Sequence, residues 1–83
     1  MEEGRLIGKV SHYFSNIEVA VIDLTDTLKD GDTIRIAGGE VDFTQKAESM
    51  EVEHEKVKEA KHGDSVGLRV EQKVREGYQV YKI

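Results

Sequence analysis

The chain has 83 residues and a net charge of −5 at pH 7, and charged residues make up 35% of it. A chain of this length folds as one domain with a thin core, which leaves little room for a deep catalytic cavity. It contains no cysteine, so disulfides, thiol catalysis and cysteine-based zinc sites are excluded.

The first ten residues, MEEGRLIGKV, lack the basic start and long apolar stretch of a signal peptide. No apolar run approaches the ~20 residues that a membrane-spanning helix needs. We therefore expect a soluble, cytoplasmic protein with one domain over residues 1–83. The many charges and the scarcity of asparagine, glutamine and methionine resemble a thermophile's composition, which acidic mesophilic domains can share.

Strand patterns dominate the first half of the chain. Apolar blocks at residues 6–14 and 17–24 flank Ser15 and Asn16, a plausible hairpin tip. In the next block, DTIRIAGG, Ile34 and Ile36 share one face and Arg35 takes the other.

Two glycines, Gly38 and Gly39, then turn the chain into VDFTQ. This block points Val41 and Phe43 inward and Asp42 and Thr44 outward. The blocks SVGLRV and YQVYKI complete the strands.

A charged residue and a glycine precede three of these strands. The three stretches are KDGD at residues 29–32, HGD at 62–64 and REG at 75–77. Glycine supplies the positive φ that tight turns require, and aspartate bonds nearby backbone amides. Several short strands separated by such turns predict an antiparallel sandwich or barrel.

The glutamate-rich middle, AESMEVEHEKVKEAK, has two interpretations from its pattern alone. Five residues lie at helical spacing and predict a helix over residues 47–61: Ala47, Met50, His54, Val57 and Ala60. Met50 and Val52 also fit a period of two, which predicts a strand to about His54 followed by a charged loop.

Motifs that carry chemistry are absent. Neither a phosphate-binding loop nor G-x-G-x-x-G is present, which excludes GTP hydrolysis, and no G-x-S-x-G frames a nucleophile. His12, His54 and His62 have no paired spacing, and Asp30-Gly31-Asp32 lacks the rest of a calcium loop. We expect no metal, no cofactor and no enzymatic activity.

Basic and aromatic residues are interleaved along the strands. Arginines and lysines beside exposed rings bind nucleic-acid ends by charge and stacking. The competing interpretation pairs the basic side chains with the more abundant acids and buries the rings. The net negative charge favours this second interpretation. The two sets are Arg5, Lys9, Arg35, Arg69, Lys73 and Arg75, and Tyr13, Phe14, Tyr78 and Tyr81.

The order of the blocks resembles a known family. A G-K-V strand, LKDGDTIRIAG, a segment ending SMEVEHEKVKEAKHGD, then SVGLRV and a strand after REG follow one another. This order resembles the β-barrel domain that follows the GTPase domain of elongation factor Tu, over roughly residues 5–83. It is also similar to small translation-elongation-factor-like proteins and to the closing barrel of collagenase-like peptidases. The resemblance implies a strand over residues 48–54 and a loop over 55–62.

This resemblance also implies a ligand surface. In elongation factor Tu the strand that matches KHGDSVGLRV helps to receive the aminoacylated end of tRNA. Carried over by position, the implied residues are Gly63, Asp64, Ser65, Val66, Gly67 and Leu68, with Arg35 and Arg69 as candidate basic partners. The family's asparagine is replaced by Ser65, and the GTPase half of the tRNA site is missing. The competing interpretation makes this stretch a turn capped by Asp64 and a core strand.

We therefore expect an all-β fold, a small closed antiparallel Greek-key β-barrel of six or seven strands over about residues 5–83. Leu28 and Val57 should plug its ends. The expected function is a non-catalytic module that binds tRNA, rRNA or a translation-associated protein. The alternative is an accessory module for a separately encoded enzyme of RNA modification or proteolysis. The expected inward residues are Leu6, Val10, Val21, Ile34, Ile36, Phe43, Met50, Val66, Leu68, Val70 and Val80.

Overall fold

The computed structural model describes residues 4–83, so the first three residues of the expected domain lie outside the described part. Within it the chain forms ten β-strands and no helix, which confirms the all-β class. The strands are β1 (Arg5–Phe14), β2 (Val19–Leu24), β3 (Leu28–Lys29), β4 (Thr33–Gly38), β5 (Val41–Lys46), β6 (Glu51–Val52), β7 (Glu55–Lys56), β8 (Glu59–Ala60), β9 (Ser65–Arg69) and β10 (Gln79–Lys82).

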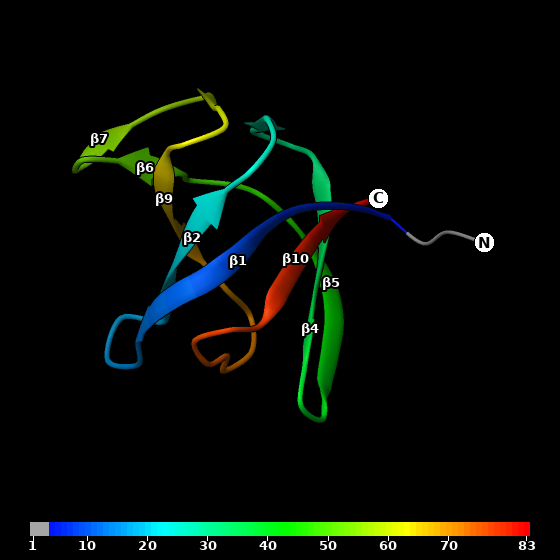
Figure 1. Ribbon diagram of the computed structural model, residues 1–83. Coiled ribbons are helices and arrows are strands. Elements are labelled where there is room, and N and C mark those ends of the chain that lie inside the picture. The colour runs from blue at the N-terminus through cyan, green and yellow to red at the C-terminus, as the bar shows by residue number, and fades with distance from the viewer. Residues whose placement is uncertain (1–3) are drawn as a thin grey trace.

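Eight strands form one sheet in the order β5-β4-β10-β1-β2-β9-β6-β7, and β3 pairs with β8 in a second, two-stranded sheet. Every pairing is antiparallel. The last strand, β10, lies between β1 and β4, so the two ends of the described chain are neighbours (Figure 1). Since no helix is present, nothing in residues 4–83 is a helix that spans a bilayer.

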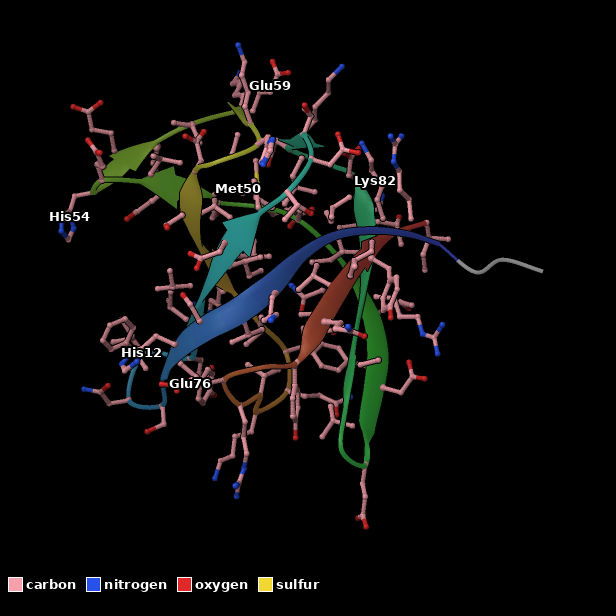
Figure 2. All side chains as sticks on the ribbon, in the orientation of Figure 1. His12, Met50, His54, Glu59, Glu76 and Lys82 are labelled. Atoms are coloured by element: carbon pink, nitrogen blue, oxygen red, sulfur yellow. The ribbon has the colours of Figure 1, made fainter. Side chains whose placement is uncertain are left out.

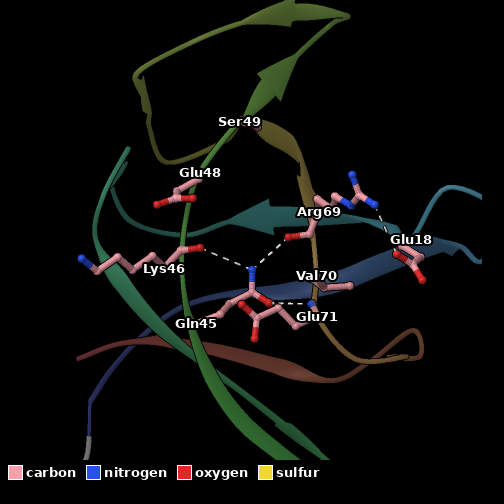
Figure 3. Close-up of a pocket in the computed structure, with 8 residues that line it drawn as sticks. All are labelled: Glu18, Gln45, Lys46, Glu48, Ser49, Arg69, Val70 and Glu71. Carbon is pink, nitrogen blue, oxygen red and sulfur yellow. Dashed lines mark hydrogen bonds and ion pairs between the residues drawn. The ribbon is translucent and has the colours of Figure 1, made fainter.

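Closure of the large sheet into a barrel is not confirmed. Backbone ladders leave β5 at one edge and β7 at the other. Across the gap beside β5, the side chain of Gln45 donates to the carbonyl oxygen of Arg69 at 2.9 Å and accepts from the amide of Glu71 at 2.8 Å (Figure 3). Gln45 is the only buried polar side chain among the described residues. One side chain therefore bridges the gap between β5 and the end of β9, which we call the Gln45 seam. In a closed barrel, backbone hydrogen bonds between paired strands would close this gap.

The three glycine turns share one geometry. In the first two, the amide of Asp32 or Asp64 bonds the carbonyl three residues earlier, and its carboxylate accepts from the amide of Lys29 or Lys61 at 2.9 Å. The glycine at the third position has a φ of 95° in one of these turns and 96° in the other. In the third turn, at residues 75–78, Gly77 has a φ of 94° and the amide of Tyr78 bonds the carbonyl of Arg75. These angles suit the third residue of a type II turn, so the aspartates cap turns as their sequence pattern predicted.

The core holds most of the expected residues: Val10, Leu28, Ile34, Ile36, Phe43, Met50, Val66, Leu68, Val70 and Val80 are buried. Val57 is only partly buried and packs against the core.

The prediction that Leu6 and Val21 face the core was wrong. Leu6 is 48% exposed, because pairing shifts register between Leu6 and Gly8, and again between Val10 and His12. Such bulges break the alternation along a strand, so Ile7 and Val10, three residues apart, both face the core.

Val21 also points outward. Residues 19–22 are apolar on both faces, and a period of two cannot tell which face is buried. The register decides it: Ile22 lies opposite Val66 in the core, whereas Val21 lies opposite Gly67 on the outer face.

The glutamate-rich middle contains no helix, which agrees with the interpretation that the resemblance implied. The strand is shorter than expected, since β6 covers only Glu51–Val52, and the expected loop contains the two short strands β7 and β8. Glu53 and His54 form the β6–β7 turn with φ values of 56° and 68°. The helix predicted over residues 47–61 does not form, because this turn reverses the chain near the middle of that segment.

Candidate functional site

Gly67 lies in the middle of the outer face of β9. Its cross-strand neighbours are Val21 on β2 and Glu51 on β6. Alternation along β2 and β9 places Val19, Val21 and Gly67 on one side of the sheet and Ile22, Val66 and Leu68 on the other. The sheet therefore presents a row in which a bare backbone lies between two side chains.

A shallow hollow covers this bare position. Two adjoining cavities of about 250 Å³ and 300 Å³ share four lining residues, Ile17, Val19, Glu51 and Gly67. We call their combined space the Gly67 groove. Phe14 stands beside it with 42% of its surface exposed, and Ile17 is 55% exposed. Adjacent exposed apolar side chains of this kind are a candidate interaction surface.

Glycine at position 67 is not required by the fold. A Cβ built there would meet only Val19 Cγ1 at 3.7 Å and the Glu51 carbonyl oxygen at 3.8 Å, both ordinary contacts. By contrast, a Cβ on Gly8 would lie 2.8 Å from the Asp23 carbonyl oxygen, and one on Gly38 would lie 2.3 Å from the Tyr78 ring. The five other glycines have positive φ. Of the eight glycines, only Gly67 has neither an atom too close to the Cβ position nor a positive φ. Glycine nevertheless weakens the interior of a strand.

The predicted ligand residues separate into different roles. Gly63 and Asp64 form the turn before β9, and Ser65 donates to Asp23 Oδ1 at 2.8 Å. Val66 and Leu68 are completely buried, so their side chains belong to the core and not to the surface. Gly67 and Ser65 line the groove.

The two predicted basic partners lie apart. Arg69 lines one end of the groove and pairs with Glu18 at 3.5 Å. Arg35 is on β4, which three strands separate from β9, and it does not join this surface. Its guanidinium bonds both oxygens of Asp42, at 2.8 Å and 2.6 Å, and lies 5.9 Å from the Tyr81 ring centre.

The Arg35 hydrogen bonds, supported by its charge, lower the pKa of the Asp42 carboxyl below its ordinary value of 3.8. Arg5 pairs with Asp26 at 2.8 Å. Three of the strand arginines therefore pair with acids, as the interpretation without nucleic acid expected.

The histidines do not assemble a metal site. His12 lies beside Glu76, with Nδ1 3.3 Å from Oε2, while His54 projects at the β6–β7 turn (Figure 2). Within residues 4–83 no group of three His, Cys, Asp or Glu side chains could hold a metal ion.

Sequence reasoning missed the apolar wall of the groove, formed by Phe14, Ile17, Val19 and Val21. The pattern VAVI does mark a strand that is apolar on both faces, and this was the available clue. Which face stays outside depends on the register with β9, and a single sequence does not encode that register locally.

Comparison with known proteins finds similarity to proteins that are named as peptidases. No family model matches the sequence. Over 76 residues it is 40% identical to an uncharacterized protease of Methanocaldococcus jannaschii, a match that covers 90% of this chain. The chain spans about a fifth of the length of that relative, because the match covers 19% of it.

Solved structures give the same fold. The crystal structure of the C-terminal domain of a putative U32 peptidase from Geobacillus thermoleovorans, as its selenomethionine variant, superposes with a TM-score of 0.89 at 22% identity. That match covers 94% of this chain and 99% of the other. A second crystal structure of the domain gives a TM-score of 0.88, again at 22% identity, and covers 95% and 92%. These matches support the resemblance to the closing domain of collagenase-like peptidases and give no support to the translation-factor part.

Proposed function

We propose that this chain is a non-catalytic accessory module that binds the catalytic body of a peptidase-family protein. The observation that carries the proposal is the 40% identity to a segment that makes up only 19% of a protein named as a protease. A segment this short, with the fold of the C-terminal domain of a putative U32 peptidase, is suited to docking on a larger body.

The polar contacts of the described residues support a binding role over a catalytic one. The paired carboxylates cap turns, as Asp32 and Asp64 do, hold exposed ion pairs, as Asp42 does, or accept from an exposed hydroxyl, as Asp23 does from Ser65. The outer groove over Gly67 offers apolar side chains to a partner instead. An interface of this kind needs apolar contact more than reactive groups.

The test uses the Methanocaldococcus relative without its 76 matching residues, mixed with this chain. We expect the two polypeptides to co-elute in size-exclusion chromatography as a one-to-one complex that nuclease treatment leaves intact. The relative's own matching segment, added separately, is the positive control for a competent body. Separate elution of this chain, while the control segment co-elutes, contradicts the proposal.

RNA binding is the other reading that the resemblance implied, and it is measured in the same preparation. Binding of tRNA across a salt series, together with loss of the complex on nuclease treatment, would favour that reading. The paired arginines and the acidic net charge of −5 argue for the peptidase partner.

A further inference from the structure

We infer that the Gly67 groove is the docking surface for an extended polypeptide segment of the partner, apolar at its centre and flanked by lysine or arginine. This inference rests on the proposed function and adds to it the surface and the chemistry of the contact. Four observations, on glycine placement, backbone conformation, shape and charge, converge on the same strip of the molecule.

The first observation is that Gly67 keeps a side chain out of a position with room for one. A methyl group there would make only ordinary contacts, and alanine is favoured over glycine in a strand interior. A bare backbone is useful where another chain approaches closely. Because the fold itself does not require glycine at position 67, we attribute this glycine to a binding partner that approaches the backbone closely.

The second observation is the reverse case around the same groove. Four non-glycine residues have positive φ, a conformation that glycine adopts more easily: Glu18, Ser49, Glu53 and His54. Ser49, Glu53 and His54 line the Gly67 groove, and Glu18 pairs with the Arg69 at its end. At Glu53 and His54 the two-residue β6–β7 turn imposes this backbone, for which Asn-Gly is the preferred pair. Residues with larger side chains at such positions are expected where the side chains are needed for binding. Around the groove, residues with side chains adopt backbone conformations that glycine adopts at lower cost. Gly67, in contrast, occupies a strand position that a residue with a side chain would stabilise.

The third observation is shape. The groove continues past Ser49 and Arg69 into a further cavity of about 390 Å³ at the Gln45 seam, which both residues also line. Figure 3 shows this cavity, with Arg69 and Glu18 on one side and Glu48 on the other. A strip that passes from one hollow to the next suits an extended chain better than a compact group.

The fourth observation is charge. Phe14, Ile17 and Val19 give the groove an apolar wall, while Glu51 and Glu53 stand at its rim. Glu53 forms no ion pair within residues 4–83, Glu51 lies opposite Lys56 in the β6–β7 pairing, and Arg69 is paired with Glu18. The Glu53 carboxylate, with Glu51 beside it, attracts a cationic flank and repels phosphate, so the groove favours a basic polypeptide over RNA.

The experiment measures binding of this chain to the relative's body without its matching segment, by isothermal titration calorimetry. The variants are Gly67→Leu, which fills the groove, and Glu53→Lys, which reverses the charge of the carboxylate without an ion pair at the rim. We expect Gly67→Leu to weaken binding by about a hundredfold and Glu53→Lys by about tenfold, and the second loss should shrink at high salt. Thr44→Leu adds the same side chain to the exposed face of β5 and should bind as the wild type does.

The outcomes separate the two proposals. If the wild-type chain binds and Gly67→Leu binds equally well, the groove inference is overturned and the accessory role stands. If the wild-type chain fails to bind while the relative's own segment binds, the accessory role falls and the inference with it. A complex that disappears on nuclease treatment overturns the polypeptide occupant. Gly67→Ala separates binding from folding, since it should bind more weakly while its unfolding temperature stays equal or rises.

Discussion

The ring of Tyr78 covers Gly38 so closely that a Cβ on Gly38 would lie 2.3 Å from Cδ1 of that ring. Gly38→Ala must push the ring away, and we expect it to cost about 2 kcal/mol of unfolding free energy. Gly67→Ala, in open contact, should instead be neutral or stabilise by about 0.5 kcal/mol. Urea unfolding measures both. A double variant, Gly38→Ala with Tyr78→Ala, should lose less than the two single losses added; strict additivity contradicts the clash.

Gln45 bridges β5 to the end of β9. Gln45→Leu leaves the Arg69 carbonyl and the Glu71 amide without this partner, and we expect a loss of about 2 kcal/mol. Hydrogen exchange at the Glu71 amide should quicken more than exchange in the middle of β1. Thr44→Val, on the exposed face of the same strand, is the control and should change neither quantity. Unchanged protection at Glu71 in Gln45→Leu speaks against the bridge.

The two capped turns predict a matched pair of effects. Asp32→Ala and Asp64→Ala each remove an acceptor from a lysine backbone amide, and each should cost about 1 kcal/mol in chemical denaturation. Asp32→Ala also removes the ion pair with Lys82 at 3.6 Å, so its loss should be slightly larger. Asn at either position keeps an oxygen acceptor and should recover most of the loss. If the Asn variants are as unstable as the Ala variants, charge and not the turn bond accounts for the effect.

Asp42 predicts a pH dependence. Because Arg35 lowers the pKa of Asp42 in the folded state, the folded protein binds this proton less readily than the unfolded chain. The resulting stabilisation is present above the ordinary pKa of 3.8 and is lost as pH falls through the lower, folded value. The stability difference between wild type and Asp42→Asn should therefore narrow in acid, as followed by thermal unfolding from pH 7 to pH 2.5. Arg35→Gln should show the same narrowing, and a difference that stays constant with pH contradicts the pairing.

The β6–β7 turn predicts a stabilising change. Glu53 and His54 both have positive φ, as the central residues of a type I′ turn do, and Asn-Gly is the preferred pair there. Replacing them with Asn-Gly should stabilise the protein by about 1 kcal/mol in urea unfolding. Asn-Gly in place of Ser15 and Asn16, in the four-residue β1–β2 loop, is the control and should not stabilise. Loss of stability in the first variant would show that the two side chains hold the turn.

The turns were the easiest part of the fold to predict. The KDGD and HGD stretches predict their turns locally, because a glycine with positive φ and an aspartate acceptor lie within the same four residues. The inward faces of β4 and β5 were also predictable, because Ile34, Ile36 and Phe43 alternate with polar neighbours. Prediction failed in β1, where two bulges reset the alternation and exposed Leu6.

The candidate site was predictable only in part. Gly67 was one of six residues that the resemblance assigned to a ligand surface, and it lines the groove. Nothing in the fold requires glycine at this position, which is why Gly67 points to a binding surface. This can be seen only in the tertiary structure, where Val19 and Glu51 are the neighbours of a Cβ built on Gly67. Arg35 was grouped with it on charge alone, and three intervening strands separate the two.

The sequence by itself determined the strand class, the capped turns and most of the core, because period-two burial and turn chemistry act over a few neighbouring residues. The register between β2 and β9 was decided only in the tertiary structure. That register turns Val19 and Val21 outward, places Gly67 between Val21 and Glu51, and so creates the groove. Strand pairing between residues some 45 apart in the chain depends on how all faces pack at once, and no local pattern contains that information.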